Sequence, residues 1–164
     1  MTQLAEGARL TGHSGNDEIG TPKPLFNWLE RRFQFNYDAA ASHVNALTTH
    51  YSTSEGTPRG HGNQLTMDGL TYPWANWRVF VNPPYSTALM RAFVEKAIEE
   101  RNNAEIIVML VKYDPSTATG RLLDDRRYFH LEQPMRVKFD GMTSASTFPV
   151  VVAIVKPDPW RAGK

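Results

Sequence analysis

The hydrophobic positions of the chain alternate between helical spacing and short strand-like runs. In TPKPLFNWLERRF, residues 21–33, apolar side chains recur every three or four positions, and Thr21 and the prolines suit a helix start. The same spacing recurs in STALMRAFVEKAIEERNN, residues 86–103. The strand-like runs are FQFNYD (33–38), WRVFV (77–81), EIIVMLV (105–111), MRVKF (135–139) and FPVVVAIVK (148–156).

The order of these elements predicts an α/β protein with a mostly parallel sheet. Residues 105–111 are apolar throughout, which is typical of a strand covered on both faces. We expect a weak helix over 118–125 and a C-terminal antiparallel strand pair formed by 135–139 and 148–156. Residues 1–20, with glycines at irregular intervals, are predicted to be a flexible N-terminal arm, residues 21–156 one domain, and residues 157–164 a tail.

Composition narrows the class of protein. The chain has 164 residues, 41% of them apolar and 21% charged, as in an ordinary globular domain. A net charge of +1 creates no global field that demands nucleic acid. The absence of cysteine excludes disulfides, thiolate metal sites and cysteine nucleophiles. MTQLAEGARL has no apolar core of signal-peptide length and FPVVVAIV is too short to span a bilayer, so we expect a soluble intracellular protein without membrane contact.

The most informative motif is Asn82-Pro83-Pro84-Tyr85, which follows the strand predicted at 77–81. The Asn82 side-chain carbonyl and the Pro83 backbone carbonyl are acceptors, and the prolines hold them in one geometry because proline fixes φ. Two such acceptors can bind both hydrogens of a planar amino group and draw its lone pair out of conjugation, while Tyr85 stacks on the attached ring. Asp38 is expected at the carboxyl end of another strand, where α/β sheets bind ligands, so Asp38 and Asn82 should face one crevice.

This tetrapeptide matches the signature of amino-methyltransferases, in which S-adenosylmethionine gives its methyl group to an exocyclic or amide nitrogen. With the flanking segments TPKPLFNWLERRFQFNYDAAASHVNA, DGL, FVEKAIEE and EIIVMLV in this order, residues 21–156 resemble phage-encoded Dam-type DNA N-6-adenine methyltransferases. The resemblance implies a Rossmann-like S-adenosylmethionine-dependent methyltransferase fold for that domain. It also implies S-adenosylmethionine as cofactor, a flipped-out adenine in double-stranded DNA as substrate, and a phage or prophage protein acting in the cytoplasm of a bacterial host.

The resemblance also implies roles for individual residues. Asn82 and the Pro83 carbonyl would hold the adenine amino group and Tyr85 would stack on the base, which is worth about 1–3 kcal/mol against the cost of flipping. The cofactor would contact Thr21, Pro22, Phe26, Asp38, Ala39, Ala40, Asp68 and Asn82, with Thr21, Pro22 and Phe26 at its methionine end. The base would contact Pro84, Tyr85, Ser86, Lys112 and Tyr113. Apart from the resemblance, the charge of Arg59, Arg121, Arg126 and Arg127 makes these residues candidates for contacts with DNA phosphates.

Several of these assignments have alternatives. Asp38 would bind either the ammonium group or the ribose hydroxyls of the cofactor, or would serve only as a helix N-cap. Asp68 could equally be an ordinary turn residue, and the arginines near residues 121–127 a solvated helix face, since Asp124 and Asp125 lie among them. No pair of histidines has metal-ligand spacing on a firm helix, so no metal site is predicted.

Two features keep other functions open. The loop after Asp38 reads DAAAS and lacks the Gly-x-Gly of many methyltransferases, so a non-catalytic DNA- or nucleotide-binding relative is one hypothesis. The same tetrapeptide also serves methylation of cytosine N4, guanine in RNA and protein glutamine, although the flanking segments favour adenine. DPSTATG, residues 114–120, faintly resembles the loop of methyltransferases with permuted motifs, but it follows Asn82 too closely for that order.

Overall fold

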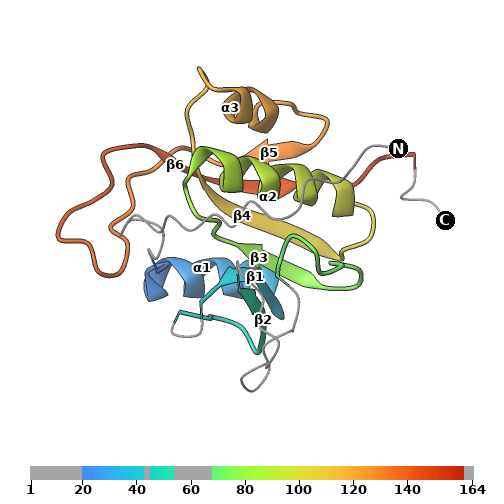
Figure 1. Cartoon of the computed structure of the whole chain (residues 1–164), viewed down its shortest axis with the longest axis horizontal. Coiled ribbons are helices and arrows are strands. Elements are labelled where there is room, and N and C mark those ends of the chain that lie inside the picture. The colour runs from blue at the N-terminus through green and yellow to red at the C-terminus, as the bar shows by residue number, and fades with distance from the viewer. Residues whose placement is uncertain (1–19, 43–44, 54–67, 161–164) are drawn as a thin grey trace, which may run out of the picture.

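A computed structural model describes residues 20–42, 45–53 and 68–160 of the chain (Figure 1). In these residues six strands form one sheet: β1 Tyr37–Ala41, β2 His50–Thr53, β3 Arg78–Val81, β4 Ile106–Lys112, β5 Phe129–Leu131 and β6 Val150–Val155. Their spatial order is β2-β1-β3-β4-β6-β5, in which β6 runs antiparallel to both neighbours and the other pairs are parallel. The mostly parallel sheet fits the predicted Rossmann-like architecture. Residues 1–19 of the expected arm and 161–164 of the expected tail lie outside the described residues.

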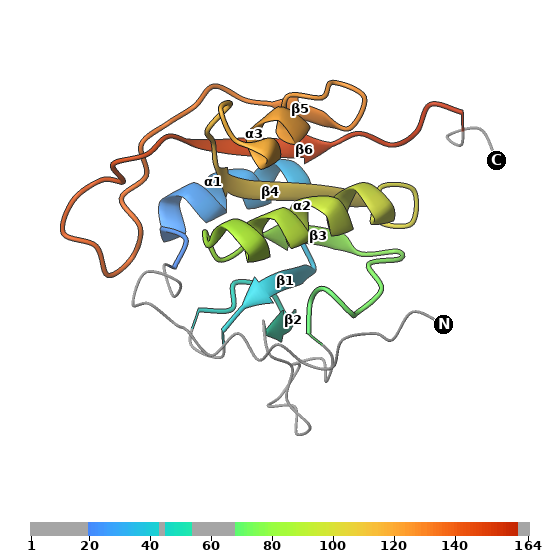
Figure 2. The same cartoon turned by 45° about the horizontal axis from the view of Figure 1, so that its top comes forward.

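Helices cover both faces of the sheet (Figure 2). Helix α1, Lys23–Phe33, packs on one face, and α2, Thr87–Glu100, and α3, Ala118–Leu123, pack on the other. In β4 the alternate residues Val108 and Leu110 join the α1 cluster, while their neighbours join the α2 cluster. Burial on both faces explains why this strand is apolar without interruption. No helix in the described part of the chain is long and apolar enough to cross a membrane.

The start of α1 differs from the prediction. The helix begins at Lys23 and Pro22 occupies the preceding position, so Thr21 does not cap it. Instead the Thr21 hydroxyl accepts a hydrogen bond from the side chain of Asn82, 61 residues further along the chain. Thr21 thus connects the beginning of α1 to the end of β3.

The boundary between α1 and β1 also lies later than predicted. Phe33 is the last residue of the helix, and Gln34 then adopts a left-handed conformation with φ of 51°. This turn interrupts the apparent alternation at residues 33–37, so the strand starts at Tyr37 and continues to Ala41. Asp38 therefore lies inside β1 and not at its carboxyl end. The interpretation of Asp38 as a helix N-cap is also wrong, because no described helix follows it directly.

The C-terminal antiparallel pair is not confirmed in its predicted form. Residues 135–139 form no strand; Met135 makes one isolated bridge to Val150. The partners of β6 are instead β4 and the short β5, which the sequence pattern did not reveal. Val137 and Phe139 are buried, so the apolar and polar residues of 135–139 do alternate between core and surface. The backbone of this connection, however, forms no strand. The helix expected over 118–125 is confirmed as α3, and β2 was missed.

Candidate active site

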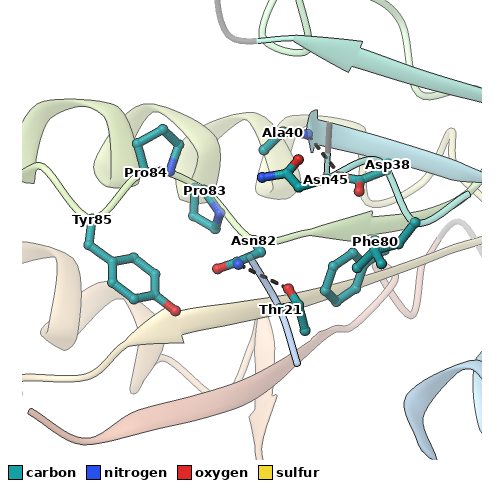
Figure 3. Close-up of a pocket in the computed structure, with 10 residues that line it drawn as sticks. Thr21, Asp38, Ala40, Asn45, Phe80, Asn82, Pro83, Pro84 and Tyr85 are labelled. Atoms are coloured by element: carbon teal, nitrogen blue, oxygen red, sulfur yellow. Dashed lines mark hydrogen bonds between the residues drawn. The ribbon is translucent and has the colours of Figure 1, made fainter. Parts of the chain in front are cut away.

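One small cavity joins the motif to the residues around Asp38 (Figure 3). Its volume is about 30 Å³, which is enough to hold at least one water molecule. It is lined by Thr21, Asp38, Ala40, Asn45, Leu47, Phe80, Asn82, Pro83, Pro84 and Tyr85. The parallel pairing of β1 with β3, which sets Asp38 opposite Phe80, explains why these segments meet. The expected crevice shared by Asp38 and Asn82 therefore exists.

The Asn82 side chain is oriented by Thr21. Its Nδ2 donates to the Thr21 Oγ1 at 3.0 Å, across the space between β3 and the beginning of α1. Figure 3 shows the amide oxygen on the side that faces Tyr85, and the ring of buried Pro83 lies above the amide in this view. The amide is therefore oriented with its NH₂ group toward Thr21 and its oxygen toward the rest of the motif.

Asp38 is a buried carboxylic acid in the wall of the cavity, with 3% of its surface exposed. Burial raises the pKa of Asp38 to about 7, and hydrogen bonds from the backbone N–H groups of Ala40 and Leu47 only partly oppose that rise. The Ala40 bond to Oδ1 is long, at 3.3 Å. In the described part of the chain no cationic side chain forms an ion pair with Asp38. A cation placed in the cavity would therefore gain a strong electrostatic partner.

Tyr85 lies at the other end of the cavity and is partly buried. Its hydroxyl donates to the backbone carbonyl of Leu110 at 3.3 Å. Its ring meets the rings of Phe139 and Phe148 nearly perpendicularly, with centroids 5.7 Å and 5.6 Å away. Burial raises the pKa of the Tyr85 phenol, so this side chain is a neutral ring and hydroxyl at ordinary pH.

The predicted cofactor residues divide into two groups. The first group lines the small cavity and consists of Thr21, Asp38, Ala40 and Asn82. The others are not among its lining residues: Pro22, Phe26, Ala39 and Asp68.

Three residues of the second group have local structural contacts. The ring of Phe26 packs in the core against Phe35 and Phe80. Ala39 points to the opposite face of the sheet, in the α2 cluster. The carboxylate of Asp68 accepts hydrogen bonds from the turn that follows it, including the backbone N–H groups of residues 70 and 71 at 2.9 Å.

The predicted DNA-contacting residues are dispersed. Pro84 and Tyr85 line the cavity, and Ser86 is exposed just before α2. Tyr113 and Arg126 line a second cavity of about 610 Å³ beside α3, β5 and β6. The remaining side chains have other contacts: Lys112 with the Phe148 ring, Arg121 with the Ser116 carbonyl, and Arg127 with Asp125. Arg59 lies outside the described residues.

Sequence reasoning missed three cavity residues, Asn45, Leu47 and Phe80. The Asn45 Oδ1 accepts a hydrogen bond from the Ser42 N–H at 2.6 Å, shortly after the end of β1. The signal for Asn45 in the sequence was that this polar residue follows the strand that contains Asp38 by only a few positions. Phe80 carried none, because one apolar strand residue looks like another.

The loop at residues 114–120 serves local structure. The Thr117 hydroxyl accepts from the Gly120 N–H at 3.0 Å and caps α3. The Asp114 carboxylate accepts from Ser116, which holds the pKa of that exposed group below its ordinary value. No residue of this loop lines the cavity around Asn82.

Two matches to known proteins bear on the family of the chain. Residues 10–122 match the model of the family described as DNA N-6-adenine-methyltransferase (Dam). A DNA N-6-adenine-methyltransferase of Escherichia phage T1 is 32% identical to the chain over 118 residues, which is 68% of this chain and 44% of that protein. The chain thus spans less than half the length of this relative. Every residue that lines the small cavity falls within the part that matches the family model.

Proposed function

The chain belongs to the DNA N-6-adenine-methyltransferase (Dam) family, and from this premise we propose that it methylates adenine N6 at specific sites in double-stranded DNA. The proposal includes S-adenosylmethionine as cofactor, the corresponding methyltransferase form of the Rossmann-like fold, and action in the cytoplasm of a bacterial host. The observation that carries it is the cavity in which Asn82-Pro83-Pro84-Tyr85 meets Thr21 and Asp38. A turn that merely ended β3 would need neither partner.

The motif acts on the target adenine by holding its amino group. The Asn82 Oδ1 and the Pro83 carbonyl accept the two N6 hydrogens, which localises the nitrogen lone pair. S-adenosylmethionine supplies an electrophilic methyl group on a sulfonium. When bound, it would give this methyl group to N6 with loss of the bond to sulfur, and one N6 proton would then leave to solvent. Orientation of this kind can contribute on the order of 7–11 kcal/mol. A general base is not required, because the proton leaves after the nitrogen has attacked.

Asp38 and Thr21 are suited to the methionine end of the cofactor. The resemblance places Thr21 at that end, and Thr21 and Asp38 line the same cavity of about 30 Å³. Of the two cofactor groups considered for Asp38, the ammonium group is the cationic one, and we assign it as the partner of this carboxylate. The buried carboxylate lacks an ionic partner among the described residues, so a cationic group fits the donor and acceptor set that is present.

DNA contact depends on local charge, because the net charge of the chain is only +1. We assign phosphate contacts to Arg121 and Arg126, which are exposed near α3. Arg127 contributes less, since its guanidinium is already bonded to Asp125 at 2.6 Å. Lys112 and Tyr113 lie at the end of β4, where α/β sheets bind ligands, and are assigned to the flipped base or its neighbours.

The proposed activity is tested by incubating the protein with unmethylated genomic DNA and S-adenosylmethionine labelled in its methyl group. After digestion to nucleosides, label is expected in N6-methyldeoxyadenosine alone. Label in N4-methyldeoxycytidine would move the substrate to cytosine, and cofactor binding without any transfer would identify a non-catalytic relative. Sequencing of DNA from cells that express the protein, by a method that detects methyladenine, then defines the target site.

The role of Asn82 is tested by Asn82→Ala. We expect methyl transfer to fall by about 100-fold or more, because one of two preorganised acceptors is lost, while the Kd for the cofactor changes little by calorimetry. Asn27→Ala, on the exposed side of α1, is the matched control and should behave as wild type. An Asn82→Ala variant with the wild-type transfer rate would show that Asn82 is only a turn residue.

A further inference from the structure

We propose that Phe139 and Phe148, on the connection between β5 and β6, position the Tyr85 ring and thereby set the rate of methyl transfer. The inference rests on the proposed function, in which Tyr85 stacks on the target base. Both phenylalanines lie beyond residues 10–122, the part of the chain that matches the family model. Their role therefore has to be argued from the contacts of Tyr85.

Two phenyl rings approach Tyr85 in the geometry that aromatic pairs favour. Phe139 lies at a centroid distance of 5.7 Å with an interplanar angle of 74°, and Phe148 at 5.6 Å with 85°. Aromatic pairs prefer such edge-to-face contacts at about 4.5–7 Å because a positive ring edge meets a negative ring face. Phe139 is itself only 1% exposed, in the α1 cluster, so it is a fixed reference point for the tyrosine.

The hydrogen bond of Tyr85 does not determine how its ring is rotated. A hydrogen bond from the hydroxyl fixes the end of the side chain, but the ring can still turn about the axis that runs through the hydroxyl. The bond to the Leu110 carbonyl is also long, at 3.3 Å. Contacts from Phe139 and Phe148 oppose this rotation, and the plane of the ring is the property that base stacking requires.

The connection that carries both phenylalanines is anchored at several points near the cavity. The Asp140 N–H donates to the Gly20 carbonyl at 2.9 Å, next to the residue that binds the Asn82 amide. The Ser146 N–H donates to the carbonyl of residue 137 at 2.8 Å and its hydroxyl to the Phe148 carbonyl at 2.7 Å. Figure 1 and Figure 2 show this segment projecting beyond the sheet between β5 and β6. One connection therefore adjoins both ends of the cavity.

The test replaces the aromatic edge while keeping apolar volume, with Phe148→Leu and Phe139→Leu. Phe33→Leu is the matched control, because Phe33 belongs to the same cluster and contacts Phe35 but not Tyr85. Phe148→Tyr retains an aromatic edge and serves as the conservative rescue. Phe148 is partly exposed, so its variants remain folded even where Phe139→Leu is destabilised.

The first measurement is single-turnover methyl transfer at saturating cofactor and DNA. We expect Phe148→Leu to lower the rate by about 10- to 100-fold, since a misplacement of about 1 Å at a reacting pair costs on the order of 100-fold. The Kd for S-adenosylmethionine should stay unchanged, and Phe148→Tyr and Phe33→Leu should keep rates near wild type. Transfer by Phe148→Leu at the rate of Phe33→Leu would overturn the inference.

The second measurement does not depend on activity. In protein labelled with 3-fluorotyrosine, the ¹⁹F resonance of Tyr85 is identified by its loss in Tyr85→Phe. It should shift or broaden in Phe148→Leu and Phe139→Leu and stay in place in Phe33→Leu; an unchanged resonance refutes the positioning role. If wild-type protein transfers methyl to no base, the proposed function fails, and the resonance still decides whether these phenylalanines hold Tyr85.

Discussion

Replacing Asp38 by asparagine should change how the stability of the protein depends on pH. Asparagine has nearly the same shape and can still accept a backbone hydrogen bond, but it does not ionise. Wild-type Asp38 has its pKa raised from 3.8 to about 7 by burial. The neutral acid is therefore favoured in the folded protein. At any pH at which Asp38 is ionised in the unfolded chain, the free energy of unfolding is reduced.

The sign and size of the effect follow from the difference between the folded and unfolded pKa values of Asp38. Below pH 3.8 the carboxyl is protonated in both states, and ionisation costs no stability. Between that value and about 7 the unfolded state loses its proton first, so wild-type stability falls as pH rises. A pKa difference of 1 corresponds to about 1.4 kcal/mol, so the total loss is on the order of 4 kcal/mol above pH 7. The asparagine variant avoids this loss, although one weakened hydrogen bond reduces its gain to about 2–4 kcal/mol.

Urea denaturation at several pH values measures this difference. The free energy of unfolding of Asp38→Asn minus that of wild type should rise from pH 4 to pH 8, with most of the rise below pH 7. Asp114→Asn is the matched control, because hydrogen bonds from Ser116 lower the pKa of Asp114 below 3.8, so its profile should stay nearly flat between pH 4 and pH 8. A difference for Asp38→Asn that stays flat within about 1 kcal/mol would refute the burial argument.

Three further predictions concern the same region. If Asp38 binds the ammonium group, calorimetric affinity for S-adenosylmethionine should fall as pH drops below about 7, approaching tenfold for each pH unit, and Asp38→Asn should remove this dependence. Thr21→Val removes the acceptor for Asn82 and should slow single-turnover transfer by about five- to tenfold, whereas Thr21→Ser should retain the wild-type rate. Gly69→Ala should lower the urea-unfolding free energy by at least about 1–3 kcal/mol, because the new Cβ would meet the Ala39 carbonyl oxygen at 1.7 Å; wild-type stability there would contradict the close packing behind β1.

The elements of the fold were largely predictable where the hydrophobic pattern was long. α2 and β4 lie where the sequence predicted them. The fourteen residues of α2 are enough to show helical spacing of apolar side chains, and the seven residues of β4 are enough to show an apolar run with no polar interruption. Short elements were less well determined. β2 and β5 have only four and three residues, and the alternation at 135–139 reflects burial without strand pairing. A pattern of buried side chains does not show whether the backbone of a segment pairs with a neighbouring strand, or with which one.

The site divides in the same way. The acceptors of Asn82-Pro83-Pro84-Tyr85 were evident from the sequence, since proline fixes the local backbone whatever surrounds it. Family membership likewise follows from residues 10–122 read as a string. Asp68 and Phe26 show the limit of this reading: one closes a turn and the other fills the core, and nothing in their neighbours along the chain distinguishes those positions from a cofactor site.

What the sequence determined by itself is therefore the chemistry of one rigid tetrapeptide and the succession of elements that carries it. Only the tertiary structure decided that Thr21 holds the Asn82 amide, that Asp38 is buried enough to raise its pKa, and that Phe139 and Phe148 flank Tyr85. The physical reason is range. Proline geometry acts between adjacent residues, whereas burial and orientation depend on which strands lie side by side, and the sheet order β2-β1-β3-β4-β6-β5 brings those distant residues together.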